Sequence, residues 1–418
     1  MKTQLKITVV AVSLACGSAF AQDSTYDPRS LAMGGTGVTT SDISNAAFHN
    51  PAMLASARAD DHFTMELPII SLRLLDPNNL QNSASNLSTN ASNLTNALNA
   101  FQAAPAAATA VGASAALTAF NSSLQAVSQK SLSADALIGV VLAIPSSKYA
   151  ASLVVDGRVE AAGQFNYAAA DNATITTLST NLNTCEAGGA CSTAGLNAGG
   201  KVANLTSSLQ VRGVIAKDVG IAMAHHFDDF YGLDLGVVPK ITQYASYDYT
   251  TLAQNNAKVT LNQGQKDFSG FNVDVGASKA FKTDNGNDVK AGLALKNLMP
   301  QSYTTVLGNN ITVKPQVTAG ASYVTKLTTA GVDLDLIHNQ AMLTGMVKDS
   351  QYLRLGAEFD AWRWAQIRVG YRHDLLGNYP GLPSIGLGLS PFGIHFDFSV
   401  AAASRNEMAV SLQSGFRF

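Results

Sequence analysis

Two adjacent histidines followed by two aspartates are the densest group of reactive side chains in the sequence. They are His225, His226, Asp228 and Asp229, in the run HHFDD. Imidazole and carboxylate groups are metal ligands, so a metal site is one interpretation. Adjacent residues of a strand point to opposite faces, however, and both rings would not readily reach one ion. A solvated turn is the better interpretation, and we expect neither a metal nor a cofactor.

Two pairs of carboxylates at alternate positions could act as a general acid and a general base. In a hollow fold they are more simply polar groups of a wet interior, paired with arginines of neighbouring strands. The sequence contains no G-x-S-x-G and no H-E-x-x-H, so we expect no enzyme; an outer-membrane phospholipase or protease is the strongest enzymatic alternative. The carboxylates are Asp333, Asp335, Glu358 and Asp360, and the arginines are Arg354, Arg368 and Arg372.

A glycine-rich run near the N-terminus, Met33-Gly34-Gly35-Thr36-Gly37, superficially resembles a phosphate-binding loop. It lacks the G-K-[ST] ending, follows no strand pattern and has no acidic residue at dinucleotide spacing. We therefore reject phosphate binding. The simpler interpretation is a coil in which glycine lets the backbone pass close to other groups.

The elements that would position these residues are strands, because apolar and polar residues alternate through the C-terminal part of the chain. Four segments show the pattern: Tyr352–Ala361, Trp364–Leu375, Gly393–Ala403 and Met408–Phe418. In a soluble sandwich the apolar face would be buried, whereas in an outer-membrane barrel it would face lipid. Segments of about 10 residues match a tilted membrane-crossing strand.

The last strand ends in Gly415-Phe416-Arg417-Phe418, with Phe416 and Phe418 in phase with its apolar face. A terminal aromatic residue in this position resembles the signal that outer-membrane assembly machinery reads. Together with strand length, this favours the barrel, with outer-membrane lipid and the assembly machinery as partners.

Composition agrees with a barrel of this kind. The chain has 418 residues, of which 13% are charged and 46% are hydrophobic. Beyond the N-terminus no apolar run reaches the roughly 20 residues of a membrane-spanning helix. The net charge is −2 without a basic patch, so we do not expect direct contact with nucleic acid.

The N-terminus has the pattern of a secretory signal peptide over residues 1–21. Lys2 and Lys6 precede an apolar region, Ile7–Cys16, and Ala19-Phe20-Ala21 is a cleavage site, so the mature chain would begin at Gln22. Lipoprotein processing at Cys16 is the alternative, but Leu14 stands one place too close to it. The chain is thus expected in the outer membrane of a Gram-negative bacterium.

Cleavage at this site leaves two cysteines, Cys185 and Cys191, at a Gly/Ala-rich stretch between strand patterns. In an oxidising compartment such a pair forms a disulfide that closes a surface loop. A redox or metal site is the alternative, but the spacing is not C-x-x-C and no histidine lies nearby.

Motifs at both ends of the chain resemble a known family. Arg29–Gly37, Ala46–Ala52 (AAFHNPA) and Glu66–Ile70 (ELPII) are similar to the opening of FadL-like outer-membrane barrels. The similarity is closer to their TraF-like branch, named for the F plasmid transfer operon. Gln351–Glu358 (QYLRLGAE) and Arg368–Tyr371 (RVGY) resemble the ending of that branch.

The resemblance implies that residues 22–60 fold into the lumen of a barrel formed by residues 61–418. A wide barrel encloses more space than its own side chains fill, so a small, glycine-rich segment suits it. Asn50-Pro51 would give a rigid turn. The implied plug motif consists of Met33, Gly34, Gly35, Gly37, Asn50, Pro51 and Ala52, and the implied polar lumen lining of Arg354, Glu358, Asp360, Arg368 and Arg372.

The strand patterns predict an all-β, antiparallel up-and-down barrel of about 14 strands. Pro68 inside the first strand implies a kink, an edge or a bulge. Besides the four C-terminal segments, the expected strands are His62–Leu75, Asp135–Pro145, Ala150–Phe165, Ala203–Ala216, Val219–His226, Gly232–Thr251, Phe271–Phe281, Val289–Leu298, Lys314–Val324, Thr329–His338 and Leu382–Leu389.

Residues 77–130 predict a helical insertion after the first strand. Leu80, Leu87, Leu94 and Phe101 recur every seven residues, and no charged residue occurs in Leu80–Gln129. The hairpin could lie in the membrane interface or cap the pore. We favour an insertion whose helices pack on each other, because the polar face lacks lysine and arginine.

Two functions remain open. The FadL resemblance implies passive uptake of hydrophobic small molecules, with the N-terminal segment as the gate. The name of the closer branch implies a structural role in conjugal transfer or in the cell envelope.

Overall fold

The computed structural model describes residues 19–20, 26–56, 63–144, 146, 148–252, 264–360, 364–403 and 407–417. Most of the predicted signal peptide, including Cys16, and the terminal Phe418 lie outside these residues. A two-residue strand, β1 (Ala19–Phe20), pairs in parallel with β4.

Fourteen antiparallel strands form one closed sheet, as the strand patterns predicted. Each strand pairs with its neighbours along the chain, and the last strand pairs with the first, so no edge is left open. The strands are β2 (Thr64–Leu75), β3 (Ser131–Ile144), β4 (Tyr149–Asn166), β7 (Ser208–Phe227), β8 (Leu233–Leu252), β9 (Gln265–Lys282), β10 (Asp288–Lys296), β13 (Gln316–Val324), β14 (Thr328–Asp335), β15 (Tyr352–Asp360), β16 (Ala365–Asp374), β17 (Leu382–Leu389), β18 (Ile394–Ala403) and β19 (Glu407–Arg417).

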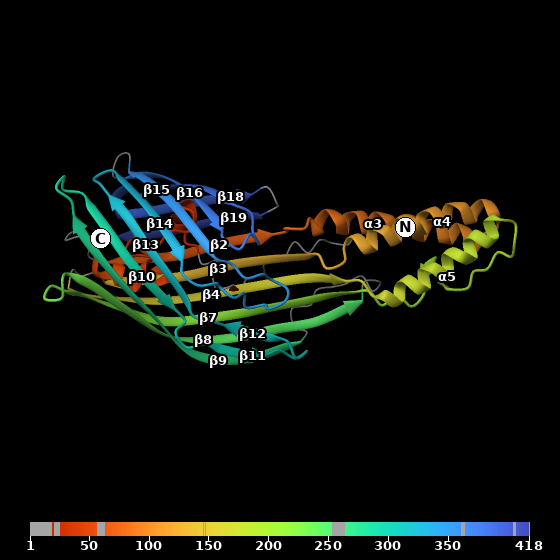
Figure 1. The fold of residues 1–418 in the computed structure, drawn as a ribbon, viewed down its shortest axis with the longest axis horizontal. Coiled ribbons are helices and arrows are strands. Elements are labelled where there is room, and N and C mark those ends of the chain that lie inside the picture. The colour runs from red at the N-terminus through yellow and green to blue at the C-terminus, as the bar shows by residue number, and fades with distance from the viewer. Residues whose placement is uncertain are drawn as a thin grey trace.

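The two ends of the barrel differ in their connections. Short turns, one of them containing the 3-10 helix η3 (Pro391–Gly393), join the strands at the end where β2 begins and β19 ends; we call it the turn end. Long connections occupy the opposite end, which we call the loop end. A helical extension projects from the loop end (Figure 1).

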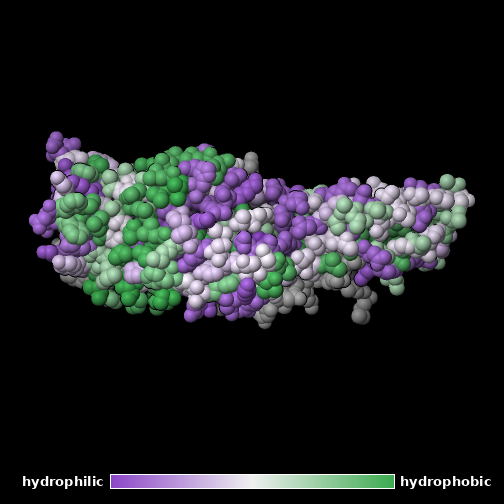
Figure 2. Space-filling view, turned by 60° about the horizontal axis from the view of Figure 1, so that its bottom comes forward, coloured by the Kyte–Doolittle hydropathy of each residue, from purple (hydrophilic) through white to green (hydrophobic). Residues whose placement is uncertain are grey.

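Side chains alternate between the two faces of the barrel wall, as the period of two predicted. Phe359, Ile385 and Leu387 point outward and are about half exposed, at 49%, 51% and 51%. Their neighbours Glu358 and Gly386 point inward, toward the lumen. A band of hydrophobic surface crosses the visible face of the barrel (Figure 2).

One predicted turn was wrong. Ala203–Ala216 and Val219–His226 were expected as two strands joined at Lys217-Asp218, but β7 runs without interruption through this pair. Asp218 is buried on the lumen side. Two adjacent charged residues predict a turn where neither face of a strand is expected to bury a charge. In β7, Asp218 points into the lumen, where Arg158 pairs with it.

The expected irregularity at Pro68 is a bulge. The pairing of β2 with β3 shifts between Glu66 and Ile69, and its pairing with β19 shifts between Gln413 and Gly415. Proline cannot donate a backbone hydrogen bond, so inside a strand such an interruption accommodates it.

The extension is a bundle of three helices: α3 (Leu80–Ala103), α4 (Ala107–Ala126) and α5 (Ala169–Glu186). The expected hairpin packs on itself, and its buried residues form one cluster with Ile175 and Leu178 of α5. The third helix was missed, although Ile175, Leu178, Leu182 and Cys185 are spaced as one buried helical face. None of the helices in the described part of the chain is both long and apolar enough to cross a membrane.

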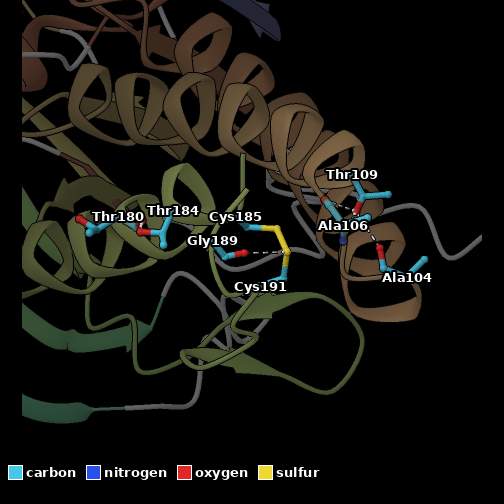
Figure 3. Close-up of a disulfide and its surroundings, with 8 residues drawn as sticks. All are labelled: Ala104, Ala106, Thr109, Thr180, Thr184, Cys185, Gly189 and Cys191. Atoms are coloured by element: carbon cyan, nitrogen blue, oxygen red, sulfur yellow. Dashed lines mark hydrogen bonds between the residues drawn. A yellow bond between two sulfur atoms is a disulfide. The ribbon is translucent and has the colours of Figure 1, made fainter. Parts of the chain in front are cut away.

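The predicted disulfide is confirmed. Cys185 ends α5 and is joined to Cys191, close to the N-terminal end of α4 (Figure 3). Cys185 is almost fully buried, so the bond closes the end of a packed helix and not a free surface loop. The short strands β5 (Leu196–Asn197) and β6 (Lys201–Val202) follow it.

Two further connections fold over the lumen at the loop end. They are the hairpin of β11 (Gln301–Thr304) and β12 (Asn310–Val313), and the segment 336–351. Met342 and Leu343 of this segment pack with Ile311 against Ala216 and Tyr244 of the wall. We call these two connections the loop cap.

Candidate functional site in the barrel lumen

Residues 26–56 lie inside the barrel and fold into three short helices: α1 (Pro28–Ala32), α2 (Ala46–His49) and η1 (Pro51–Ser56). Asp27 caps α1, accepting a hydrogen bond from the Ser30 backbone N–H at 3.0 Å, and Pro28 occupies the first helical turn. The same carboxylate accepts from Asn45 Nδ2 at 2.6 Å and lies 2.6 Å from His49 Nε2. One buried aspartate therefore ties the two ends of the segment together.

The glycines of the MGGTG run permit close approach to the wall and to the rest of the segment. Gly34 and Gly35 have φ of +70° and +91°, and a Cβ on Gly34 would lie 2.6 Å from the Leu355 carbonyl oxygen. A Cβ on Gly37 would lie 2.4 Å from the ring of His49. The run is thus a packing element, in line with our rejection of phosphate binding.

The wall carries matching glycines, which we call the glycine belt. A Cβ on Gly370 would lie 2.0 Å from the Gly34 backbone nitrogen, and one on Gly276 would lie 1.8 Å from Asn50 Oδ1. Gly331, Gly356 and Gly370 oppose one another across three neighbouring strands. The belt consists of Gly236, Gly276, Gly292, Gly320, Gly331, Gly356, Gly370 and Gly386.

The Asn50-Pro51-Ala52 motif joins the segment to β9. Asn50 is fully buried; its Nδ2 donates to Val38 O at 2.8 Å and to Ala277 O at 3.1 Å, and its Oδ1 accepts from the Ala52 N–H at 3.1 Å. All its contacts lie within the segment or the wall. This geometry is structural, because a buried amide needs every one of these partners.

Charged groups hold the segment on the side of the lumen formed by β13–β19. Asp333 Oδ2 accepts the backbone N–H groups of Gly37 and Val38 at 2.7 and 2.9 Å. Arg29 reaches Glu358 at 2.9 Å, and Arg417 reaches Asp42 at 3.1 Å. We call this side the ionic face.

The arginines that the sequence singled out all lie on the ionic face. Arg354 contacts Asp335 at 2.6 Å, Arg372 contacts Glu407 at 2.7 Å, and Arg368 contacts Glu358 at 2.6 Å and also Asp397. All three guanidinium groups are buried. Each buried charge has an opposite partner within a few ångströms, which such burial requires.

Asp360 does not join this network. It lies at the last residue of β15 and accepts a hydrogen bond from Gln366 Nε2 at 3.3 Å. Asp333 and Asp335, by contrast, are both buried in the lumen. Asp333 accepts from backbone N–H groups of residues 37 and 38, and Asp335 accepts from Arg354 and from Thr318, among others, so both are structural groups here.

On the opposite side of the lumen a cluster of apolar residues faces the segment, beside paired charges such as Lys240 and Asp274. This corrects in part the expectation that inward-facing residues are polar. Phe48, Met53 and Leu54 pack there against β2, β3, β4, β7 and β8. We call this side the apolar face. Its buried wall residues are Ile69, Leu137, Val141, Ala143, Ala150, Val154, Ala222, Ala224 and Val238.

Two small cavities of about 40 Å³ each remain between the segment and the wall. One is lined by Phe48, Arg158, Lys240 and Asp274 among others, and the second by His49, Asp333 and Arg354 among others. Each has room for no more than a few water molecules. The segment thus packs closely against the wall around these two cavities.

The two histidines of the HHFDD run point to opposite faces of β7. His225 and His226 are the last strand residues before Phe227 in β7, and the turn that was expected to contain them begins after that residue. His226 Nδ1 lies 2.6 Å from Asp234 Oδ1, while His225 stacks on Tyr149. In the part of the chain that the structure describes, no three His, Cys, Asp or Glu side chains are grouped to hold a metal ion.

Of the predicted assembly signal, Phe416 lies on the outer surface of β19 and is 40% exposed. Phe418 lies outside the described residues.

The family described as F plasmid transfer operon, TraF, protein matches residues 47–335, which is more than half of the chain. The chain belongs to this TraF family. No curated protein matches its sequence.

Solved structures similar to this TraF-family chain include a toluene transporter and a FadL homologue. The toluene transporter TbuX of Ralstonia pickettii has 13% sequence identity and a TM-score of 0.51, and the alignment covers 94% of this chain and 98% of TbuX. A FadL homologue of Pseudomonas aeruginosa has 9% identity and a TM-score of 0.49, covering 96% of this chain and 100% of that one. The TraF-family chain therefore has the fold of a FadL-like outer-membrane barrel.

Sequence reasoning missed the glycine belt and the apolar face. The glycines stand at polar-face positions of the strands, as Gly356 and Gly370 do between Leu355 and Ala357 and between Val369 and Tyr371. This was a readable signal, because a glycine facing a lumen marks close backbone approach. Inward valines and leucines of β3 and β4 gave no such signal, since both faces of those strands are apolar around Leu137, Val141 and Val154.

Proposed function

We propose that this chain is an outer-membrane channel for hydrophobic small molecules, with residues 26–56 as its plug. The observation that carries the proposal is the apolar face, where Phe48, Met53 and Leu54 rest on an apolar wall inside a closed barrel. TbuX, which has the same fold, is described as a toluene transporter, and this supports the same class of solute.

The orientation of the barrel in the membrane follows from the lengths of the connections between its strands. Outer-membrane barrels have short turns on the periplasmic side and long loops outside the cell. We therefore place the turn end in the periplasm and the helical extension and loop cap outside. A solute from outside would first meet the loop cap, which Arg212 fastens by donating to the Thr344 carbonyl at 2.8 Å.

The two faces of the plug would play different parts in opening. A hydrophobic solute can take the place of Phe48 or Leu54 without leaving a polar group unpaired. On the ionic face the same exchange would leave the buried Asp333 carboxylate without the Gly37 and Val38 N–H groups and would separate Arg29 from Glu358, at a cost of several kcal/mol. The apolar face is therefore where a path would open, while the ionic face keeps the plug attached.

The first experiment removes the plug. Deleting residues 27–54 should raise ion conductance in planar bilayers, because nothing else described in the lumen fills that level. Heat-modifiable migration in gels serves as the check that the deleted protein still forms a barrel. Unchanged conductance from a folded barrel would contradict the plug.

The second experiment tests the solute. Reconstituted vesicles containing the full chain should accumulate a labelled monoaromatic hydrocarbon or a fatty acid faster than empty vesicles, and a sugar of similar size at the empty-vesicle rate. Mass spectrometry of lipid extracts from purified protein gives a second readout. Equal rates for all three compounds would contradict a hydrophobic channel.

A second candidate function follows from the family match alone. The name of the family refers to the transfer operon of the F plasmid, so an envelope role in conjugation is the alternative. A mating assay on a deletion strain discriminates between them: lost transfer with intact hydrocarbon uptake would favour the alternative.

A further inference from the structure

The outer surface at the turn end has an aromatic cluster where β4, β7, β8 and β9 meet. Tyr149, Phe230, Tyr231 and Phe281 are exposed by 70%, 59%, 79% and 48%. Ile221 and Leu235 continue the lipid-facing surface of the same strands toward the loop end. The cluster therefore lies at the edge of the hydrophobic band, where a barrel meets lipid headgroups.

A lysine is held within this cluster by rings. Lys279 Nζ lies 5.6 Å from the centre of the Tyr231 ring and 5.0 Å from that of Phe281. Rings attract an ammonium group without using its hydrogen-bond donors. The charge is thus fixed at the boundary while its N–H groups stay available to an anion.

A histidine is fixed in the same cluster. The ring of His225 stacks on Tyr149 at 4.3 Å with an interplanar angle of 16°, and the edge contact with Phe227 is also 4.3 Å. Its Nδ1 lies 2.6 Å from the Lys148 carbonyl oxygen, which can only accept, so this nitrogen carries the hydrogen.

His225 and Lys279 lie on the same outer surface. His225 opposes Leu235, and Leu235 opposes Ala277, so His225 is two strands away from β9 and two residues away from the row of Lys279. With strands spaced by about 4.8 Å and residues by about 3.3 Å, the two backbone positions are roughly 12 Å apart. Asp228 of the β7–β8 turn lies 3.3 Å from His226 Nε2.

We propose that Lys279, Tyr231 and Phe281, beside the stacked rings of His225 and Tyr149, form a binding site for the phosphodiester of an anionic phospholipid in the leaflet at the turn end. A cation at the boundary of the hydrophobic band needs an anion at the same depth, and lipid phosphates lie there. The acyl chains of the same lipid would cover Ile221 and Leu235. The site does not depend on which solute crosses the lumen.

The test uses the full chain, purified in detergent and mixed with equal amounts of phosphatidylglycerol and phosphatidylethanolamine. Native mass spectrometry should show preferential retention of phosphatidylglycerol. Lys279→Gln should lower that retention about fivefold, the factor that corresponds to the roughly 1 kcal/mol of one lysine near an anionic surface. The matched control is Lys326→Gln, which removes an exposed lysine from another turn at the same end and should change little.

A second variant keeps the charge. Phe281→Leu removes one ring beside the Lys279 ammonium, so retention of phosphatidylglycerol should fall although the net charge is unchanged. Heat-modifiable migration verifies that each variant folds. Equal retention of the two lipids by the wild-type chain, or an equal loss in Lys279→Gln and Lys326→Gln, would overturn the site.

Discussion

The ionic and apolar faces hold one plug by different means. On the ionic face, Asp333, Glu358 and Arg417 fix residues 29–42 through directed charge contacts. On the apolar face, Phe48 and Leu54 pack without any such constraint. Directed contacts specify one position, whereas apolar packing tolerates exchange of one apolar partner for another. A plug built in this way can stay in register on one side and yield on the other.

The largest effect is expected from the ionic face. Arg368→Ala should lower the free energy of unfolding by about 4 kcal/mol, because it leaves Glu358 and Asp397 buried without their shared cation. Urea unfolding in lipid vesicles measures it, with Asp360→Asn as the control outside the network. A loss below about 1 kcal/mol would mean that water replaces the guanidinium, and the two faces would then differ less than we infer.

A smaller loss is expected from the apolar face. Leu54→Ala should cost about 3 kcal/mol through lost burial and the cavity left behind, since Leu54 is fully buried. Leu54→Met keeps the volume and should cost less than about 1.5 kcal/mol in the same assay. An equal loss in the free energy of unfolding for both substitutions would show that packing does not hold the plug on the apolar face.

Asp333→Asn tests the contact between Asp333 and the plug backbone without changing the side-chain volume. An amide oxygen still accepts from the Gly37 and Val38 N–H groups, but each bond loses its charge assistance. We expect the open fraction in planar bilayers to rise about tenfold, which corresponds to about 1.4 kcal/mol. Thr318→Val, on the neighbouring strand β13, is the control, because the Thr318 hydroxyl donates to Asp335 and not to the plug.

The smallest effect is a response to acid that only the ionic face should show. Burial raises the pKa of Asp42, but the Arg417 and Arg29 guanidinium groups lower it by more, and the net pKa lies below its ordinary value of 3.8. Stability from these pairs is present above pH 3.8 and is lost as the pH falls further. Conductance should rise in that window, and Asp42→Asn should raise it already at neutral pH.

Much of the barrel could be predicted because its outer face follows a simple rule. Lipid demands apolar side chains at every second position, so β15, β16, β18 and β19 were readable from alternation alone. An irregularity at Pro68 could be predicted because proline has no backbone N–H to donate to a neighbouring strand. The positions of the arginines followed too, because a charged residue on these strands can only point inward.

The remaining features depend on what the lumen contains, and alternation does not encode that. Leu137 and Val154 point inward because Phe48 and Leu54 cover them, and Phe48 lies far away in the sequence. Asp218 was predicted as a turn residue because the partner that allows its burial, Arg158, lies on another strand. The helix α5 was hidden by threonines that are typical of strands but whose hydroxyls bond back to carbonyls four residues earlier.

The lack of charge on α3 and α4 bears on how this protein meets its surroundings. At 24 residues, α3 is about 36 Å long, so the bundle reaches well beyond the barrel mouth. Surfaces of cells and particles interact over such distances chiefly through their charges, and those forces fade as salt is added. The uncharged surfaces of α3 and α4 neither attract nor repel at long range, so first encounters on their side of the bundle should depend little on salt, in contrast to encounters near Glu186 of α5.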